Sequence, residues 1–151
     1  MSAPREVAVS RPDAALPSPR ATGFAPGRAA PVGGLSNAWI AVHADGRVTL
    51  MFNKLEMGQG TATGQAMIVA EELDVELGAV EVLQADHDPR YNDPVFRMML
   101  TGGSTGIANM IEPLSHAAAA ARAMLLEAAA RRLGVAASEL ATEPGVVVHS
   151  A

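Results

Sequence analysis

Two glycine-rich clusters constrain this chain more than any other feature, because each stands directly before a stretch with helical character. They occupy residues 58–64 and 101–106. The first amides of a helix have no partner within the helix, the helix dipole adds partial positive charge there, and glycine lets an anion approach the backbone. One such cluster alone is more often a tight turn with a Thr or Ser cap. Two together are able to clamp a diphosphate.

The glycine spacing excludes two familiar phosphate-binding loops. Gly58, Gly60 and Gly64 follow G-x-G-x-x-x-G, one residue longer than the dinucleotide-binding fingerprint, and no acidic residue ends a following strand about 20 positions later. The G-K-[ST] of a Walker loop does not occur. The chain has 16 acidic and 11 basic residues, so attraction for an anion must come from aimed amides rather than from a basic patch. The hydroxyls that would add donors are those of Thr61, Thr63, Thr101, Ser104 and Thr105.

Turn residues and apolar spacing predict a strand, helix, strand unit around the first cluster. Residues 38–43 and 47–52 are β-rich runs separated by Ala-Asp-Gly, which is a strong hairpin signal. A helix is predicted after the cluster, followed by a short strand at residues 80–84. The predicted apolar face of that helix consists of Ala66, Met67, Ala70, Leu73 and Leu77.

The second cluster opens onto an alanine-rich helix that extends to about Leu133. Either this helix kinks at Pro113 or it begins there, because proline is tolerated in the first turn. A last strand is predicted at residues 146–149, with an exposed edge that favours self-association. The predicted fold class is therefore α+β, with a small mixed sheet and two helices.

Composition divides the chain into two parts. Residues 1–36 hold six of the ten prolines, mixed with Ala, Ser and Gly, and are expected to form a disordered leader. They lack the apolar run of a secretory signal, and the chain has no run of 18 apolar residues. We therefore expect no membrane span, and a cytoplasmic location is favoured over a periplasmic one. The net charge of −5 argues against nucleic-acid binding.

The two clusters resemble those of a known family. The resemblance rests on three segments: E-M-G-Q-G-T-A-T-G-Q-A-M at residues 56–67, A-E-E-L-D-V at residues 70–75 and T-G-G-S-T at residues 101–105. They are similar to the molybdopterin-binding large subunit of the xanthine dehydrogenase/aldehyde oxidase family, and within it to the beta subunits of isoquinoline 1-oxidoreductase-like enzymes. The resemblance implies that residues 37–151 form part of the molybdopterin cofactor-binding domain of molybdenum hydroxylases.

The resemblance also implies a set of ligand-contacting residues. In the family the two motifs contact the pyranopterin and the diphosphate of molybdopterin cytosine dinucleotide. The residues that carry over are Met57, Gly58, Gln59, Gly60, Thr101, Gly102, Gly103, Ser104 and Thr105. At Gly106 the family more often has Ser or Ala, so a side-chain donor would be missing there.

The family's chemistry is oxidative hydroxylation of an aldehyde or an N-heterocycle, but this chain lacks parts of the machinery. The general base belongs to a G-x-G-E motif far downstream, and neither that motif nor the glycine-phenylalanine-glycine loop over the metal occurs here. We assign no catalytic residue, and expect Glu56 to be a structural hydrogen-bonding residue. The chain contains no Cys, so iron–sulfur clusters would belong to a partner chain.

We therefore expect a cofactor-binding segment that is inactive alone. The remainder of the large subunit, a small [2Fe-2S] subunit and a small-molecule substrate would complete it. The alternatives are a non-catalytic module that binds a nucleotide or another diphosphate, and an assembly fragment that packs on a partner.

Other residue groups predict little chemistry. The Asp-His-Asp run at residues 86–88 lacks the glycine turn and the glutamate of a calcium loop, and His43, His116 and His149 are too far apart in sequence to indicate a zinc site. Five methionines are expected to fill gaps in the core. They are Met67, Met98, Met99, Met110 and Met124.

Overall fold

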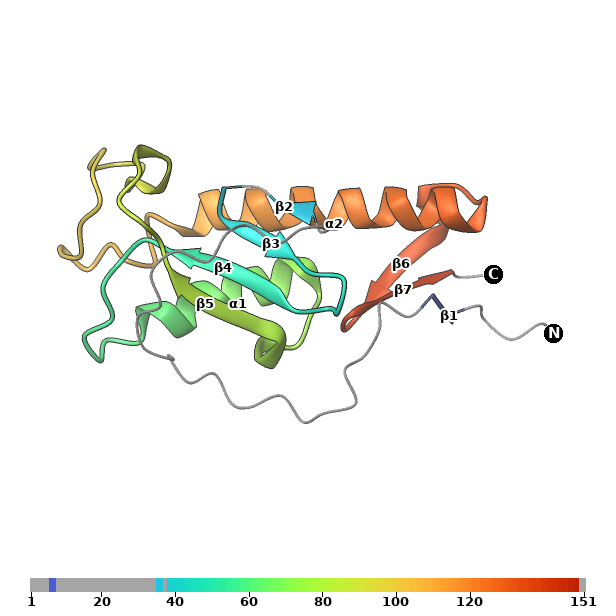
Figure 1. Cartoon of the computed structure of the whole chain (residues 1–151), viewed down its shortest axis with the longest axis horizontal. Coiled ribbons are helices and arrows are strands. Elements are labelled where there is room, and N and C mark those ends of the chain that lie inside the picture. Colours follow the sequence, from blue (N-terminus) through green and yellow to red (C-terminus); the bar gives the residue numbers. More distant parts are fainter. Residues whose placement is uncertain (1–5, 8–34, 37, 150–151) are drawn as a thin grey trace.

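A four-stranded mixed sheet carries the two glycine clusters at one of its ends (Figure 1). The computed structural model describes residues 6–7, 35–36 and 38–149 of the chain. The sheet has the order β2-β3-β4-β5, and its strands are β2 (Leu35–Ser36), β3 (Ile40–Val42), β4 (Val48–Phe52) and β5 (Val80–Gln84). The hairpin predicted at Asp-Gly joins β3 to β4, and Gly46 provides the positive φ of 84° that its turn requires.

The β4 and β5 strands are parallel, so a crossover must connect them. The helix α1 (Thr61–Leu73) and the short 3₁₀ turn η1 (Leu77–Ala79) provide this connection. Because the carboxyl ends of parallel neighbours meet at one edge of a sheet, the loop after β4 and the loop after β5 leave the sheet together. The first glycine cluster lies in the loop between β4 and α1.

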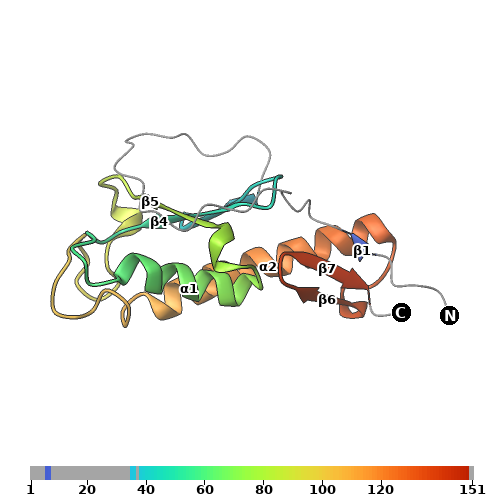
Figure 2. The same ribbon diagram turned by 90° about the horizontal axis from the view of Figure 1, so that it is seen from below.

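The second helix, α2 (Ile111–Leu133), packs beside α1, and Figure 2 shows both helices on the same side of the sheet. Leu114, Ala118 and Ala121 follow helical spacing and form its buried face. Pro113 lies in the first turn of α2, which begins at Ile111, so the proline marks the start of the helix and not a kink. The core between helices and sheet is made by Ile40, Val42, Val48, Leu50, Ala66, Val69, Ala70, Leu73, Val80, Met110, Leu114, Ala118 and Ala121.

A second, three-stranded sheet lies at the far end of α2 (Figure 1). Its order is β1-β7-β6, from β1 (Glu6–Val7), β7 (Val146–His149) and β6 (Leu140–Glu143), which follows the turn η3 (Ala137–Glu139). The predicted exposed edge at residues 146–149 is wrong, because β7 is the central strand and pairs on both sides. The hairpin is fixed to the main body where the Gly145 amide donates to the Asp74 carbonyl at 2.8 Å.

The fold class predicted from the sequence is confirmed over the described residues, with corrections in detail. Leu77 lies in η1, beyond the end of α1. The methionine prediction is wrong at three positions, because Met67, Met98 and Met124 are 56%, 57% and 48% exposed. Met110 alone of the five is fully buried. Met67 is exposed because α1 turns Ala66, Val69, Ala70 and Leu73 inward instead.

The segment expected to be a leader is only partly described. The strands β1 and β2 fall within residues 1–36, and its other residues lie outside the described part of the chain. Among the described residues, no helix combines the length and the apolar character needed to cross a bilayer.

Candidate functional site

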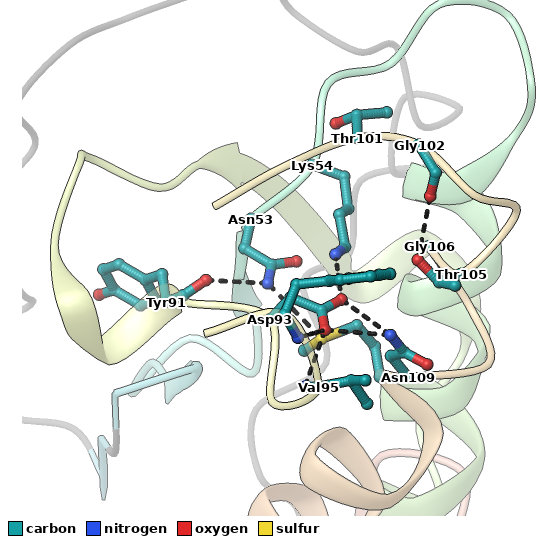
Figure 3. Close-up of polar contacts among 12 residues, drawn as sticks. Asn53, Lys54, Tyr91, Asp93, Val95, Thr101, Gly102, Thr105, Gly106 and Asn109 are labelled. Atoms are coloured by element: carbon teal, nitrogen blue, oxygen red, sulfur yellow. Dashed lines mark hydrogen bonds and ion pairs between the residues drawn. The ribbon is translucent and has the colours of Figure 1, made fainter. Parts of the chain in front are cut away.

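The two glycine clusters lie side by side at the carboxyl end of β4. The backbone amide of Leu55, just after β4, donates to the Thr101 hydroxyl oxygen at 2.6 Å, and this contact joins segments 46 residues apart. Near it, the Thr105 hydroxyl donates to the Gly102 carbonyl at 3.0 Å and tightens the second cluster (Figure 3). The structure therefore brings the two sequence-predicted groups of site residues together.

Two of the glycines serve packing between α1 and the second loop. A Cβ on Gly64 would lie 2.5 Å from Ile107 Cδ1, and a Cβ on Gly106 would lie 2.8 Å from Thr61 Cγ2. The fully buried Gln65 holds the same contact by donating to the Gly106 carbonyl at 2.8 Å. The missing side chain at position 106 is thus explained by the close approach of Thr61.

Glu56 closes the first loop on itself. One carboxylate oxygen accepts from the amides of Gly58 at 2.9 Å and Gly60 at 3.0 Å, and the other accepts from the Ala62 amide at 2.9 Å. The amides of Ala62 and Gly60, together with those of Gly58 and Gln59, lower the pKa of Glu56 below its ordinary value. The structural role expected for Glu56 is confirmed.

The Gln59 side chain also folds back on the first loop. Its oxygen accepts from the Met57 amide at 2.6 Å, and its nitrogen donates to the Leu55 carbonyl at 2.8 Å. The amides that the sequence suggested for anion binding in this loop are therefore engaged by side chains of the loop itself. The Met57 side chain is left largely in the open, with 72% of the residue exposed.

The second loop is different, because its amides are open. Gly103 and Ser104 adopt positive φ values of 65° and 56°, and residues 102–104 are exposed. Among the described residues, none accepts a hydrogen bond from the amides of Gly102, Gly103 or Ser104. Thr101 accepts from Leu55 and keeps its own hydroxyl proton available as a donor.

A buried ion pair holds residues on both sides of the second loop. Lys54 Nζ lies 2.6 Å from Asp93 Oδ2, and both side chains are almost completely buried. The other oxygen of Asp93 accepts from the amides of Val95 at 2.9 Å and Phe96 at 3.1 Å, and the Asn109 amide group donates to it at 3.0 Å (Figure 3). Burial by itself would raise the pKa of Asp93, but the hydrogen bonds from Lys54, Phe96, Val95 and Asn109 outweigh it and lower the pKa to about 2.

The sequence alone does not predict this pair. Asn-Asp-Pro at residues 92–94 is typical of a loop, and Lys54 lies in the segment that leads out of a predicted strand. A lysine two residues after a buried strand is the available signal, since a buried cation needs a carboxylate partner. The pair joins β4, the loop that follows η2 (Pro89–Tyr91) and, through Asn109, the segment that enters α2.

A cavity of about 360 Å³ opens beside both loops. Its walls are residues 53–55 after β4, residues 84–87 around the end of β5, and residues 99–101 before the second cluster. It therefore lies at the carboxyl end of the parallel strand pair, where ligands commonly bind in open α/β sheets. Asn53 lies in its wall, and its side-chain oxygen is buried without a hydrogen-bond partner among the described residues.

Among the residues weighed as metal ligands, Asp88 and His43 have other partners. Asp88 pairs with Arg90 at 2.9 Å, and the His43 ring lies 2.7 Å from the Thr49 hydroxyl. Within the described part of the chain, no group of three His, Cys, Asp or Glu side chains is arranged to hold a metal ion.

Comparison with known proteins agrees with the sequence resemblance. Residues 11–151 match the family described as Molybdopterin cofactor-binding domain, and the match begins inside the segment expected to be a leader. The beta subunit of isoquinoline 1-oxidoreductase from Brevundimonas diminuta is 40% identical over 115 residues, which are 75% of this chain and 15% of that protein. A nicotinate dehydrogenase subunit of Pseudomonas putida is 37% identical over 112 residues, or 74% of this chain and 9% of that protein.

A third relative and a solved structure extend the comparison. The membrane-bound aldehyde dehydrogenase [pyrroloquinoline-quinone] of Gluconacetobacter polyoxogenes is 32% identical over 64% of this chain and 12% of its own length. The crystal structure of quinoline 2-oxidoreductase from Pseudomonas putida 86 superposes with a TM-score of 0.54 at 21% identity, over 72% of this chain and 13% of that one, and shows the shared fold. The chain spans 9 to 15% of the length of these curated relatives.

Proposed function

The chain belongs to the molybdopterin cofactor-binding domain family, and we propose that it is the cofactor-binding segment of a molybdenum hydroxylase large subunit. In the completed complex this enzyme would hydroxylate an aldehyde or an N-heterocycle. The names of the relatives support that substrate class, since they include an isoquinoline oxidoreductase, a nicotinate dehydrogenase and an aldehyde dehydrogenase. The segment alone would be inactive.

One observation carries this proposal: the two glycine loops meet through Leu55 and Thr101, and their outer surfaces are open. A Cβ added at Gly58 or Gly60 would meet nothing within 4 Å, and one at Gly102 would meet only Leu100, at 3.5 Å. A planar or phosphorylated ligand could therefore approach the backbone closely. The donors of the second loop suit a diphosphate, so the residues present fit the cofactor that the family implies.

The site residues of this proposal are those carried over from the family resemblance. The exposed backbone of residues 57–60 would lie against the pyranopterin. Thr101, Ser104 and Thr105 would contact the phosphates together with the amides of residues 102–104. Molybdopterin cytosine dinucleotide would supply the two-electron chemistry when bound. The chain's own residues bind and orient it, and because the chain contains no Cys, the electrons would leave through [2Fe-2S] clusters of a partner chain.

Exposed apolar side chains support a covering partner. Five of the eight large hydrophobic residues exposed in the described chain belong to the loops at this end of the sheet: Leu55, Met57, Val95, Phe96 and Met98. Apolar groups gathered in this way are typical of an interface. We propose that the remainder of the large subunit covers them, and this agrees with the much greater length of the relatives.

Cofactor analysis of the protein co-expressed with its genomic neighbours tests the proposal. Molybdenum in the purified complex and cytosine nucleotide released by acid are expected. Absence of both would overturn the proposal. Nucleotide without molybdenum would indicate instead the non-catalytic diphosphate-binding module, an alternative that the comparisons do not support.

A further inference from the structure

The helix α1 has no cap at the usual position. Its N-cap residue is Gly60, with a φ of 77° and no side chain to accept a hydrogen bond, and its first turn contains no acidic residue. Amides at this end would ordinarily bind a side-chain oxygen of the N-cap residue, water or an anion.

Glu56 supplies the missing acceptor from outside the helix. Its carboxylate spans the turn and takes the amides of Gly58, Gly60 and Ala62 at 2.9 to 3.0 Å, with both oxygens engaged. Three amide donors on one carboxylate make an arrangement like that of an anion bound at a helix N-terminus. The anion in this case is part of the chain.

The second loop has no such group. Residues 99–110 contain no acidic residue, and the amides of residues 102–104 donate to no other described residue. An arriving phosphate would meet a like charge and engaged amides at the first loop, but neutral side chains and open amides at the second.

We propose that Glu56 is a positioning residue: its carboxylate occupies the anion site of the first loop, fixes that loop before any ligand arrives, and directs phosphate to the second loop. The part of this inference that concerns the cofactor's phosphates rests on the function proposed above. The part that places Glu56 in the anion site of the first loop is independent of that function, because it follows from contacts within this chain.

Inorganic phosphate is the probe for the first part. In Glu56→Ala of the full chain, amide exchange at Gly58, Gly60 and Ala62 should accelerate, and added phosphate should restore protection. The wild type should need at least about tenfold more phosphate for any response of these amides, a ratio equivalent to about 1.4 kcal/mol. Glu56→Gln, which removes the charge and keeps one acceptor oxygen, should fall between the two.

Glu71→Gln is the matched control, because Glu71 is exposed near the other end of α1 and loses the same charge. In this variant the Gly58, Gly60 and Ala62 amides should exchange at the wild-type rate and respond to phosphate as the wild-type amides do. A wild type whose three amides respond to phosphate as readily as those of Glu56→Ala would overturn the inference. So would the absence of a phosphate response in both Glu56 variants, because the site would then not bind anions.

The co-expressed complex separates this inference from the proposed function. If the wild-type complex contains no molybdenum cofactor, the proposed function fails, while the phosphate result on the full chain still stands by itself. If the complex contains the cofactor, and the Gly58, Gly60 and Ala62 amides exchange at the same rate in folded complex purified with and without it, the direction of the phosphates to the second loop is supported. Faster exchange at these amides in the folded cofactor-free complex would contradict it.

Discussion

The two glycine loops of this chain are both rich in Gly and Thr but have different supports. The first carries its own counter-charge, since Glu56 and Gln59 bind the loop amides directly. The second leaves its amides open and is held at its two flanks by the buried pair of Lys54 and Asp93. The Asp93 carboxylate accepts hydrogen bonds from Val95 and Phe96 before the loop and from Asn109 after it. The difference teaches that a glycine cluster before a helix indicates a place for an anion without telling whether the anion is a ligand or a side chain.

Removing Asp93 should cause the largest loss, because it takes away the support of the second loop. Asp93→Ala leaves Lys54 buried and unpaired, and the expected cost is about 3–5 kcal/mol in the free energy of unfolding. Urea unfolding measures it. The double variant Lys54→Met, Asp93→Leu should recover part of the loss, and Asp86→Ala on the exposed neighbouring loop should cost under about 0.5 kcal/mol. Equal stability of Asp93→Ala and wild type would remove the contrast between the loops.

Acid should weaken the same support. The pKa of Asp93 is lowered from 3.8 to about 2 in the folded chain. The ionised carboxylate therefore contributes its full stabilisation above the unfolded-state pKa, and this stabilisation is lost as the pH falls through the folded-state pKa. The expected loss between about pH 4 and pH 2 is on the order of 2 kcal/mol. Unfolding midpoints of wild type and Asp93→Asn should therefore converge over this interval. A constant difference between them from pH 5 to pH 2 would contradict the assignment.

The contact between α1 and the second loop should tolerate no added atom. Gly106→Ala places a Cβ 2.8 Å from Thr61 Cγ2, and overpacking of this kind costs about 1–3 kcal/mol. Gly102→Ala is the control, because its Cβ would meet only Leu100 at 3.5 Å. Adding Thr61→Ser to Gly106→Ala should restore part of the stability. Thermal unfolding of the wild type, the two glycine variants and the double variant measures these losses. Equal losses of stability in Gly106→Ala and Gly102→Ala would show that this packing is unimportant.

Truncating the proposed ligand contacts should change stability least and cofactor content most. Ser104→Ala removes an exposed hydroxyl, so we expect a change within about 0.5 kcal/mol and a loss of bound molybdenum from the complex. Gln59→Ala should also lower molybdenum content, but by loosening the first loop, which faster exchange at the Met57 amide would reveal. Ser138→Ala, in the distant turn η3, is the control. Unchanged molybdenum in both site variants would count against the site residues.

Local signals account for the parts of the fold that the sequence predicted. The Asp-Gly turn, the helical spacing after each glycine cluster and the valines of β7 involve residues close in sequence. The strand β6 was missed, because Leu-Ala-Thr-Glu is only weakly β-forming and becomes a strand by pairing with β7. The exposed methionines were missed because flexible apolar side chains suit interfaces as well as cores.

The site was predicted only as far as local motifs and family resemblance reach. The two clusters were found, and the structural role of Glu56 was expected, but the meeting of Leu55 with Thr101 and of Lys54 with Asp93 joins segments 46 and 39 residues apart. Such contacts depend on the crossover that places both loops at one edge of the sheet. No spacing rule along the chain encodes that placement.

The helix α2 sets a fixed distance between the two ends of the molecule. Its 23 residues, at about 1.5 Å each, extend for about 34 Å from the segment after the second loop to the terminal hairpin. Because the chain contains no Cys, single cysteines introduced at Ile111 and Arg131, both exposed, could be labelled without background. A dye at the first position would sense the neighbourhood of the loops and a dye at the second the neighbourhood of the hairpin. The order in which a covering chain reaches the two ends would then be readable in real time.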